Sequence, residues 1–372
     1  MTELFSQLFS SYFKQSKVSD VVEKQIYDFL DSYRSTLFVD GILPLASDFN
    51  LSAQKNELVI NLTLPFPCSS ELNTISASLA ELIGETVRIV GTYNILPVRE
   101  HNIKGIKNII AVSSGKGGVG KSTTAVNLAA ALQAEGAKVG LLDADIYGPS
   151  IPTLLGLKDQ QPTSKDGKLI TPLEKDGIVA MSIGFLVDDA EATVWRGPMA
   201  SRAFSQLLNE TDWPEIDYLI VDMPPGTGDI QLTLAQSVPT AASVIVTTPQ
   251  DIALIDAIKG IAMFEKVNVP VLGIVENMSY HICESCGHHS HLFGQGGGEV
   301  IAKEFSSKLL GQLPLNIKIR EQADNGQLVT YENNECEISL AYRKIAQNVA
   351  GELFKQLDMR SNENPEIEVL EV

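Results

Sequence analysis

The chain changes its pattern of hydrophobic and polar positions near residue 96, and this change divides it into two parts. In the first part, apolar residues occur in a few short stretches with helical or alternating spacing. The predicted elements are helices at 22–33 and 72–82 and strands at 57–64 and 86–90. We therefore expect residues 1–95 to form a small α+β domain, followed by a linker over 96–107 that contains Pro97.

From residue 108 onward, apolar runs alternate with segments of helical spacing. The predicted strands are 109–113, 139–142, 178–182, 218–221, 243–247, 271–275 and 309–313, and the predicted helices are 121–135, 199–208, 251–266, 297–307 and 339–357. This alternation is typical of a parallel sheet covered by helices on both faces. Residues 108–357 are thus predicted to adopt an α/β fold with a doubly wound, mostly parallel sheet, and 358–372 to be an acidic mobile tail.

Composition and charge narrow the class of protein. Hydrophobic residues make up 44% of the 372 residues, which is enough for packed cores. The net charge of −18 opposes binding to phosphate backbones, so we expect no nucleic-acid partner. No apolar run approaches the ~18 residues of a membrane span and the N-terminus lacks a signal-peptide pattern, so we expect a cytoplasmic protein with no membrane partner. Of the four cysteines, Cys68 is expected to be a buried structural thiol, and Cys336 is expected to be a solvent-side or core thiol rather than a ligand.

A glycine-rich loop between the first predicted strand and helix of the second part is the strongest motif in the chain. It reads G-K-G-G-V-G-K-S-T over 115–123 and fits the phosphate-loop pattern G-x-x-x-x-G-K-[ST]. A strand, a glycine loop and a helix N-terminus in succession direct backbone N–H groups and the helix dipole toward phosphates. The loop therefore predicts nucleotide binding. The residues that we expect around the nucleotide are Gly115, Lys116, Gly117, Gly118, Val119, Gly120, Lys121, Ser122 and Thr123.

Three aspartates follow predicted strands, at the edge where doubly wound sheets bind ligands. Asp143 and Asp145 come after the strand 139–142, and Asp222 comes after 218–221. Carboxylates at these positions suit Mg²⁺ or an attacking water, although a single aspartate there is as often a helix cap. Because three of them accompany a phosphate loop, we favour a metal–nucleotide site.

A cysteine pair is the second candidate for chemistry. Cys283 and Cys286 form a C-x-x-C that is followed by His288, His289 and His291. Three interpretations compete: a thioredoxin-like dithiol, a zinc site with both thiolates and two histidines, and an iron–sulfur cluster. A [4Fe–4S] cluster requires four thiolates, so one chain would supply half of the set and a second subunit the other half.

The second lysine of the phosphate loop makes the chain resemble the deviant Walker-A ATPases, which include the nitrogenase iron protein and the Min and Par ATPases. The resemblance implies an ATP-dependent homodimer in which Lys116 reaches the nucleotide of the partner. It implies that Lys121 pairs with the β- and γ-phosphates and that Asp145 orients or activates the attacking water. The ligand roles that it implies are Ser122, Asp143 and Asp222 around Mg²⁺ and Asn277 at the adenine ring.

Further motifs make the chain similar to the Mrp/ApbC family of iron–sulfur cluster carrier ATPases. The motifs are D-A-D-I-Y-G-P-S-I-P from 143, W-R-G-P-M from 195, D-M-P-P-G-T-G-D from 222 and the N-M-S…C-x-x-C block of 277–286. The resemblance implies slow, switch-like ATP hydrolysis and a [4Fe–4S] cluster held by Cys283 and Cys286 of both subunits. It also implies apo iron–sulfur proteins as recipients and a cluster assembly scaffold as a possible donor.

The N-terminal region resembles, more weakly, the small domain that accompanies iron–sulfur assembly factors, but it lacks that domain's usual acidic signature near the first helix. Two alternative functions remain from the residues themselves. One is a partition- or division-site-type ATPase. The other is a nucleotide-regulated protein with a structural zinc site.

Overall fold

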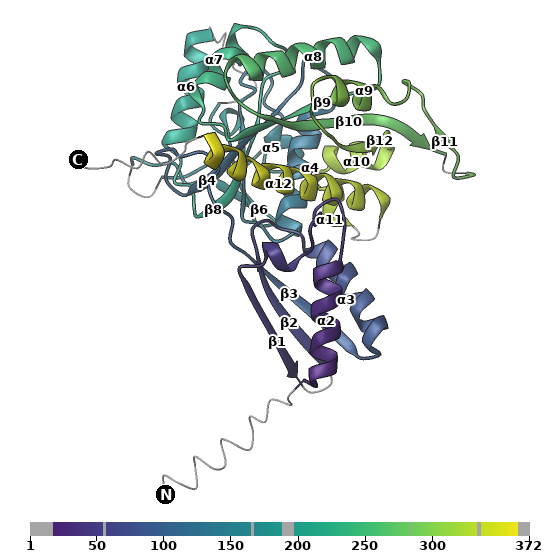
Figure 1. Ribbon diagram of the computed structural model, residues 1–372. Coiled ribbons are helices and arrows are strands. Elements are labelled where there is room, and N and C mark those ends of the chain that lie inside the picture. Colours follow the sequence, from purple (N-terminus) through teal and green to yellow (C-terminus); the bar gives the residue numbers. More distant parts are fainter. Residues whose placement is uncertain are drawn as a thin grey trace, which may run out of the picture. The chain divides into compact units, whose positions relative to one another are not determined.

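The computed structural model contains two units, Met1–Ile95 and Leu96–Val372 (Figure 1). The residues that it describes are 18–54, 57–164, 167–187, 197–283, 285–332 and 336–363. Trp195 and Arg196 of the W-R-G-P-M motif, and residues 364–372 of the predicted tail, lie outside this set. Within it, no helix is long and apolar enough to span a membrane.

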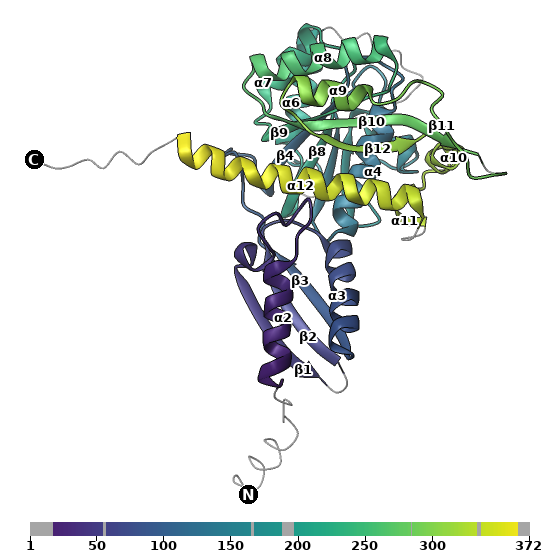
Figure 2. The same cartoon turned by 45° about the vertical axis from the view of Figure 1, so that its right-hand side comes forward.

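The first unit is a three-stranded sheet with two helices on one face (Figures 1 and 2). Its described elements are α2 (Asp20–Ser32), η1 (Leu43–Leu45), β1 (Asp48–Gln54), β2 (Glu57–Leu64), α3 (Ser69–Ile83) and β3 (Thr86–Tyr93). Strand β2 pairs antiparallel with β1 and parallel with β3. Its alternating residues Ile60, Leu62 and Leu64 are buried, as are Ile26 of α2 and Ile75 of α3. The predicted helices and strands of this region are confirmed, and β1 is an additional edge strand.

The second unit contains a nine-stranded sheet in the part of the chain that is described. Its strands are β4 (Ile106–Ser113), β5 (Val139–Asp143), β6 (Leu173–Lys175), β7 (Ile178–Ser182), β8 (Ile216–Asp222), β9 (Ala242–Thr247), β10 (Val271–Ile282), β11 (His289–Ser290) and β12 (Leu309–Pro314). The order is β11-β10-β9-β4-β8-β5-β7-β6, and β12 also pairs with β10. The pairs are parallel except β10–β11 and β6–β7. The predicted α/β class with a mostly parallel sheet is confirmed.

Helices cover both faces of this sheet. They are α4 (Lys121–Ala134), α5 (Ile151–Leu154), η2 (Ile183–Phe185), α6 (Gly197–Asn209), α7 (Asp229–Ser237), α8 (Asp251–Lys266), α9 (Gly297–Glu304), α10 (Ile317–Asp324), α11 (Val329–Glu332) and α12 (Glu337–Glu363). Helices α4, α11 and α12 pack together on one face, and α6, α7, α8 and α9 form the other layer (Figures 1 and 2). The central strands β5, β8 and β9 are buried along their whole length, which explains their continuous apolar sequences.

The helices α5, α7, α10 and α11 were not predicted, and among the predicted elements the largest difference is the length of β10. The predicted strand ended at 275 because the next residues, E-N-M-S-Y-H, are largely polar. The observed strand continues to Ile282, since its polar part pairs with β12 and β11. Shorter differences occur elsewhere: β4 begins at Ile106, inside the predicted linker, and α12 continues to Glu363.

Candidate functional site

The phosphate loop connects the buried strand β4 to α4, with Gly120 as the residue that precedes the helix. Gly120 has a φ of +83°, and a Cβ there would collide with the amide nitrogen of Asn277. The positive φ favours glycine, and a side chain at this position would have to displace the Asn277 amide. Because Gly120 has no side chain to cap the helix, the first N–H groups of α4 remain available to an anion.

One side of the loop is packed and the other is open. A Cβ on Gly115 would collide with the backbone carbonyl of Asp256 in α8, so the start of the loop lies directly against that helix. In contrast, a Cβ on Gly117 would meet nothing within 4 Å, and Lys116 is exposed. The open side, which bears Lys116, is thus accessible to a ligand or to another chain.

A buried ion pair joins the start of α4 to the end of β8. Lys121 Nζ lies 2.6 Å from Asp222 Oδ1, and the two side chains are 6% and 0% exposed. Lys121 Nζ also donates to Ser122 Oγ at 3.2 Å. Burial raises the pKa of Asp222, and the Lys121 ammonium opposes this rise. The pair places a buried cation beside the free N–H groups of the helix.

A second carboxylate lies next to this pair. Asp143 and Asp222 are register partners on the parallel strands β5 and β8, so they are neighbours at the carboxyl edge of the sheet. Asp143 accepts hydrogen bonds from the Asp145 N–H (3.1 Å) and the Ser182 hydroxyl (3.0 Å), and from the N–H that begins α5 (3.2 Å). Burial and then the negative charge of Asp222 raise the pKa of Asp143. Two buried carboxylates on neighbouring strands favour the binding of a cation.

Asp145 and the turn that follows β8 also lie at the carboxyl edge of the sheet. Burial raises the pKa of Asp145, and the charge of Lys121 opposes the rise. The turn reaches the phosphate loop directly, because the Gly226 N–H donates to the Ser114 carbonyl at 2.9 Å. Gly226 has a φ of +101°, which favours glycine at this position. The aspartates, the turn and the loop, distant in sequence, thus form one site.

The oxygen atoms at this edge fit Mg²⁺, which prefers carboxylate, hydroxyl and phosphate oxygens. Asp222 Oδ2 is buried and has no hydrogen-bond partner among the described residues, so a cation would satisfy it. Both oxygens of Asp143, by contrast, already accept hydrogen bonds from the protein. Asp222 Oδ2 is therefore an oxygen of this edge that is open to a cation, and the ligand roles expected of Ser122, Asp143 and Asp222 stay predictions.

Asn277 connects β10 to the phosphate loop. Its Nδ2 donates to the Val119 carbonyl at 2.9 Å, and its Oδ1 accepts from the Met278 N–H at 2.9 Å. In the structure the amide therefore supports the loop from beneath Gly120. The expected contact with the adenine ring stays a prediction.

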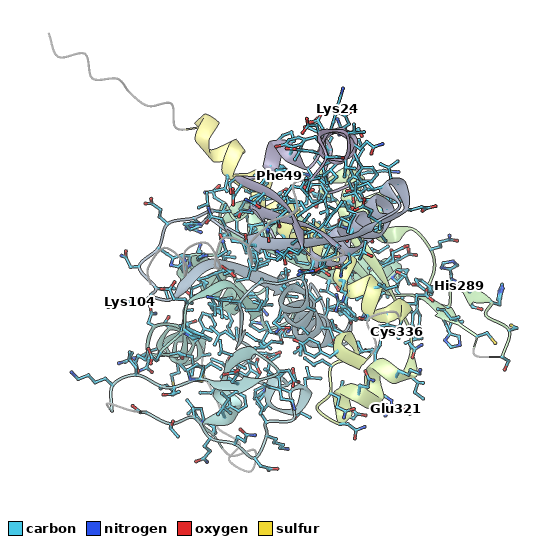
Figure 3. The ribbon with its side chains drawn as sticks, turned by 90° about the horizontal axis from the view of Figure 1, so that it is seen from below. Lys24, Phe49, Lys104, His289, Glu321 and Cys336 are labelled. Carbon is cyan, nitrogen blue, oxygen red and sulfur yellow. The ribbon has the colours of Figure 1, made fainter. Side chains whose placement is uncertain are left out.

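The C-x-x-C lies at the far end of the same strand. Strands β10 and β11 form a hairpin whose turn is closed by hydrogen bonds from the Cys283 N–H to the His288 carbonyl (3.0 Å) and from the Gly287 N–H to the Cys283 carbonyl (2.8 Å). Cys283 is half-buried and Cys286 is exposed. Figure 3 shows His289 of β11 at the periphery of the molecule. The thiols are thus presented at an outer edge of the unit.

No three His, Cys, Asp or Glu side chains in the described ranges are grouped so that they could hold a metal ion. Of the other cysteines, Cys68 is buried, as expected of a structural thiol, and Cys336 is half-buried, where its sulfur accepts from the Ser339 N–H. Sequence reasoning missed Ser182 and Glu276, a buried carboxylate of β10. The sequence feature that could have indicated Glu276 is a single acidic residue directly after the apolar run 271–275.

Comparison with known proteins yields consistent matches. The family model described as ParA: NUBPL iron-transfer P-loop NTPase matches residues 105–350. The chain is 51% identical over 351 residues to an iron-sulfur cluster carrier protein of Salmonella typhimurium, covering 92% of this chain and 95% of the relative. It is 49% identical over 257 residues to the iron-sulfur cluster transfer protein NUBPL of Mus musculus, covering 68% and 80%. Among solved structures, a nucleotide-binding protein of Archaeoglobus fulgidus in complex with ADP and with Co has a TM-score of 0.56 and 38% identity, covering 62% of this chain and 90% of that chain.

Proposed function

The chain belongs to the family of ParA/NUBPL iron-transfer P-loop NTPases, and from this premise we propose that it is an ATP-hydrolysing carrier of iron–sulfur clusters. In this proposal, two copies of the chain hold one [4Fe–4S] cluster between them in the cytoplasm. They receive it from an assembly scaffold and deliver it to apo-proteins. The main support for the proposal is that one strand, β10, joins the two motifs. It contacts the phosphate loop through Asn277 and ends in the cysteine hairpin.

The proposed binding of ATP follows from the charges at the start of α4. The N–H groups of the loop and of the first turn of α4 bind the phosphate oxygens. Lys121 is the buried cation beside them and moves from Asp222 toward the β- and γ-phosphates. Asp222 and Ser122 would then hold Mg²⁺, which neutralises phosphate charge.

Hydrolysis in this site depends on positioning and charge rather than on covalent chemistry with the protein. Asp145 is the proposed residue that orients the attacking water, and its raised pKa suits it to accept a proton transiently. The turn of Gly226 adjoins the loop, so it is placed to respond to the γ-phosphate. We propose slow turnover, because such an arrangement acts as a switch between two nucleotide states.

The proposed dimer explains the exposed groups of the site. Lys116 is exposed on the loop, so it is free to contact the nucleotide of a second subunit. Cys283 and Cys286 supply two thiolates, which is half of the coordination set of a [4Fe–4S] cargo. In a dimer with two-fold symmetry, the second subunit would supply the other two thiolates and a second Lys116 at the same time.

The test is anaerobic reconstitution of the full chain with iron and sulfide, followed by metal analysis and size-exclusion chromatography with light scattering. We expect about four iron and four sulfide per dimer, a brown chromophore, and transfer of the cluster to an apo-protein. Stoichiometric zinc without sulfide would instead support a structural zinc site. A colourless monomer in the presence of Mg·ATP would refute the proposal.

A matched pair of variants separates the two motifs. Lys116→Ala alters an exposed side chain, so we expect the fold to persist while ATP-dependent dimer closure and turnover are lost. Cys286→Ser also alters an exposed side chain, and it should abolish the chromophore while nucleotide binding persists. If either variant lost both properties together, the assignment of separate roles would be wrong.

A further inference from the structure

Strand β10 has an irregular segment between the phosphate loop and the cysteine hairpin, and the proposed function assigns no role to it. The pairing of β10 with β12 shifts register between Glu276 and Tyr280. Within this segment Met278 adopts a φ of +56°, an unfavourable value for a residue with a side chain. Such a conformation persists only where the surroundings enforce it. Figures 1 and 2 show that the strand runs from the body of the unit through this segment to β11.

The side chain of Glu276 holds this segment. The carboxylate is fully buried and accepts three hydrogen bonds. Its Oε1 accepts from the Ser279 hydroxyl (2.6 Å) and from the Gln312 amide on β12 (2.8 Å), and its Oε2 accepts from the Gly298 N–H in the first turn of α9 (2.6 Å). All three partners are neutral donors. A buried acceptor-only group thus ties the irregular segment of β10 to a neighbouring strand and to a helix.

Direct contacts continue from this carboxylate in both directions. Toward the nucleotide site, the next residue, Asn277, donates to the Val119 carbonyl of the phosphate loop. Toward the hairpin, the carbonyl of Ser279 contacts His291 Nδ1 at 3.0 Å, just beyond β11. The other side of the hairpin base is held at the residue that follows β12, where His281 Nδ1 contacts the Leu315 carbonyl at 3.2 Å. A displacement of the phosphate loop would therefore act on the hairpin through a short, packed segment.

We propose that Glu276 is a positioning residue that couples the nucleotide state at the phosphate loop to the orientation of Cys283 and Cys286. The coupling itself does not require the proposed function. Its consequence does, because only a cluster carrier would hold and release a cluster differently in the two nucleotide states. The Glu276 side chain contacts neither the phosphate loop nor the cysteines, and it acts by fixing the positions of Asn277 and Ser279 relative to each other. Without the carboxylate, the two ends of the segment adjust independently.

The test measures thiol reactivity in the full chain without any cluster. The rate of alkylation of Cys286 by an iodoacetamide reagent is followed by mass spectrometry with saturating Mg·ADP or with a non-hydrolysable Mg·ATP analogue. We expect the two rates to differ by about fivefold or more, the lower end of typical coupling between sites. In Glu276→Gln, whose amide group cannot accept all three hydrogen bonds, the ratio should fall to about 1 while both nucleotides still bind.

Two further variants complete the design. Glu299→Gln removes the same charge one residue after Gly298, but Glu299 is exposed and pairs with Lys303 on the surface of α9, so the rate ratio should persist. Ser279→Ala removes one hydrogen bond of the carboxylate and should reduce the ratio; it decides the question if Glu276→Gln does not fold.

The outcomes distinguish this inference from the proposed function. A wild-type ratio near 1 with nucleotide bound, or an undiminished ratio in the folded Glu276→Gln and Ser279→Ala variants, overturns the coupling. Failure of cluster reconstitution with a Glu276-dependent ratio would refute the carrier function and leave the coupling supported. Loss of the ratio in Glu299→Gln as well would show a non-specific effect of charge and would overturn the role of Glu276.

Discussion

Replacement of Lys121 by alanine tests the buried ion pair before any question of activity. In the folded chain, the substitution leaves Asp222 fully buried without its cation and next to a second carboxylate, Asp143. Removing one partner of a buried pair costs about 3–5 kcal/mol, a large fraction of the roughly 5–15 kcal/mol that stabilises a typical domain. We therefore expect Lys121→Ala to lower the free energy of unfolding of the nucleotide-binding unit by several kcal/mol.

The loss of unfolding free energy in Lys121→Ala should increase as the pH rises. Burial raises the pKa of Asp222 in the folded chain, and removal of Lys121 raises it further. A folded carboxyl with a raised pKa binds more protons than the unfolded one, so its contribution to stability falls as pH rises above the ordinary carboxyl value of about 4. The difference between wild type and Lys121→Ala should thus be larger at pH 8 than at pH 5.

Urea unfolding of the full chain, followed by far-UV circular dichroism at both pH values, measures these differences. Asp222→Asn in the Lys121→Ala background removes the stranded charge and should restore at least about 1 kcal/mol, as coupling between contacting residues predicts. Lys107→Ala is the matched control, because its ion pair with Asp217 is 39% exposed on the lysine side and should be worth no more than about 1 kcal/mol. Equal stabilities of wild type and Lys121→Ala, or no rescue by the second substitution, would refute the reasoning.

Three further predictions concern single residues of the site. Asn277→Ala removes one hydrogen bond to the phosphate loop, so nucleotide affinity measured by calorimetry should fall about 2- to 10-fold; an unchanged affinity would contradict the supporting role. Gly115→Ala should abolish nucleotide binding, because its methyl group would collide with the backbone of α8, whereas Gly117→Ala has open space and should retain the fold by circular dichroism. Cys286→Ser should change the free energy of unfolding in urea by less than about 0.5 kcal/mol because the side chain is exposed, and a larger loss would indicate a structural role.

Local pattern was sufficient for much of the fold. Continuous apolar runs identified the central strands, since a strand buried on both faces has no polar alternation, and helical spacing identified α8 with its bounds 251–266. The phosphate loop could be located because its glycines and lysine form a pattern with a direct physical cause in backbone geometry and charge. The polar helix α10 and the edge strand β6 were not predicted, because neither has a distinct apolar face.

The residue types of the candidate site could also be read from the sequence, but their neighbours in space could not. Order along the chain placed Asp143 and Asp222 after strands, while only the pairing of β5 with β8 made them adjacent. The same holds for Gly115 against α8 and for Glu276, whose three partners come from β10, β12 and α9. Periodicity reports which face of an element is buried, whereas the contacts across that face depend on how distant segments pack together. The amino-acid sequence by itself therefore determined most of the elements and the candidate motifs, because both depend on local pattern, and the tertiary structure decided which side chains lie together and which strand connects the two candidate sites.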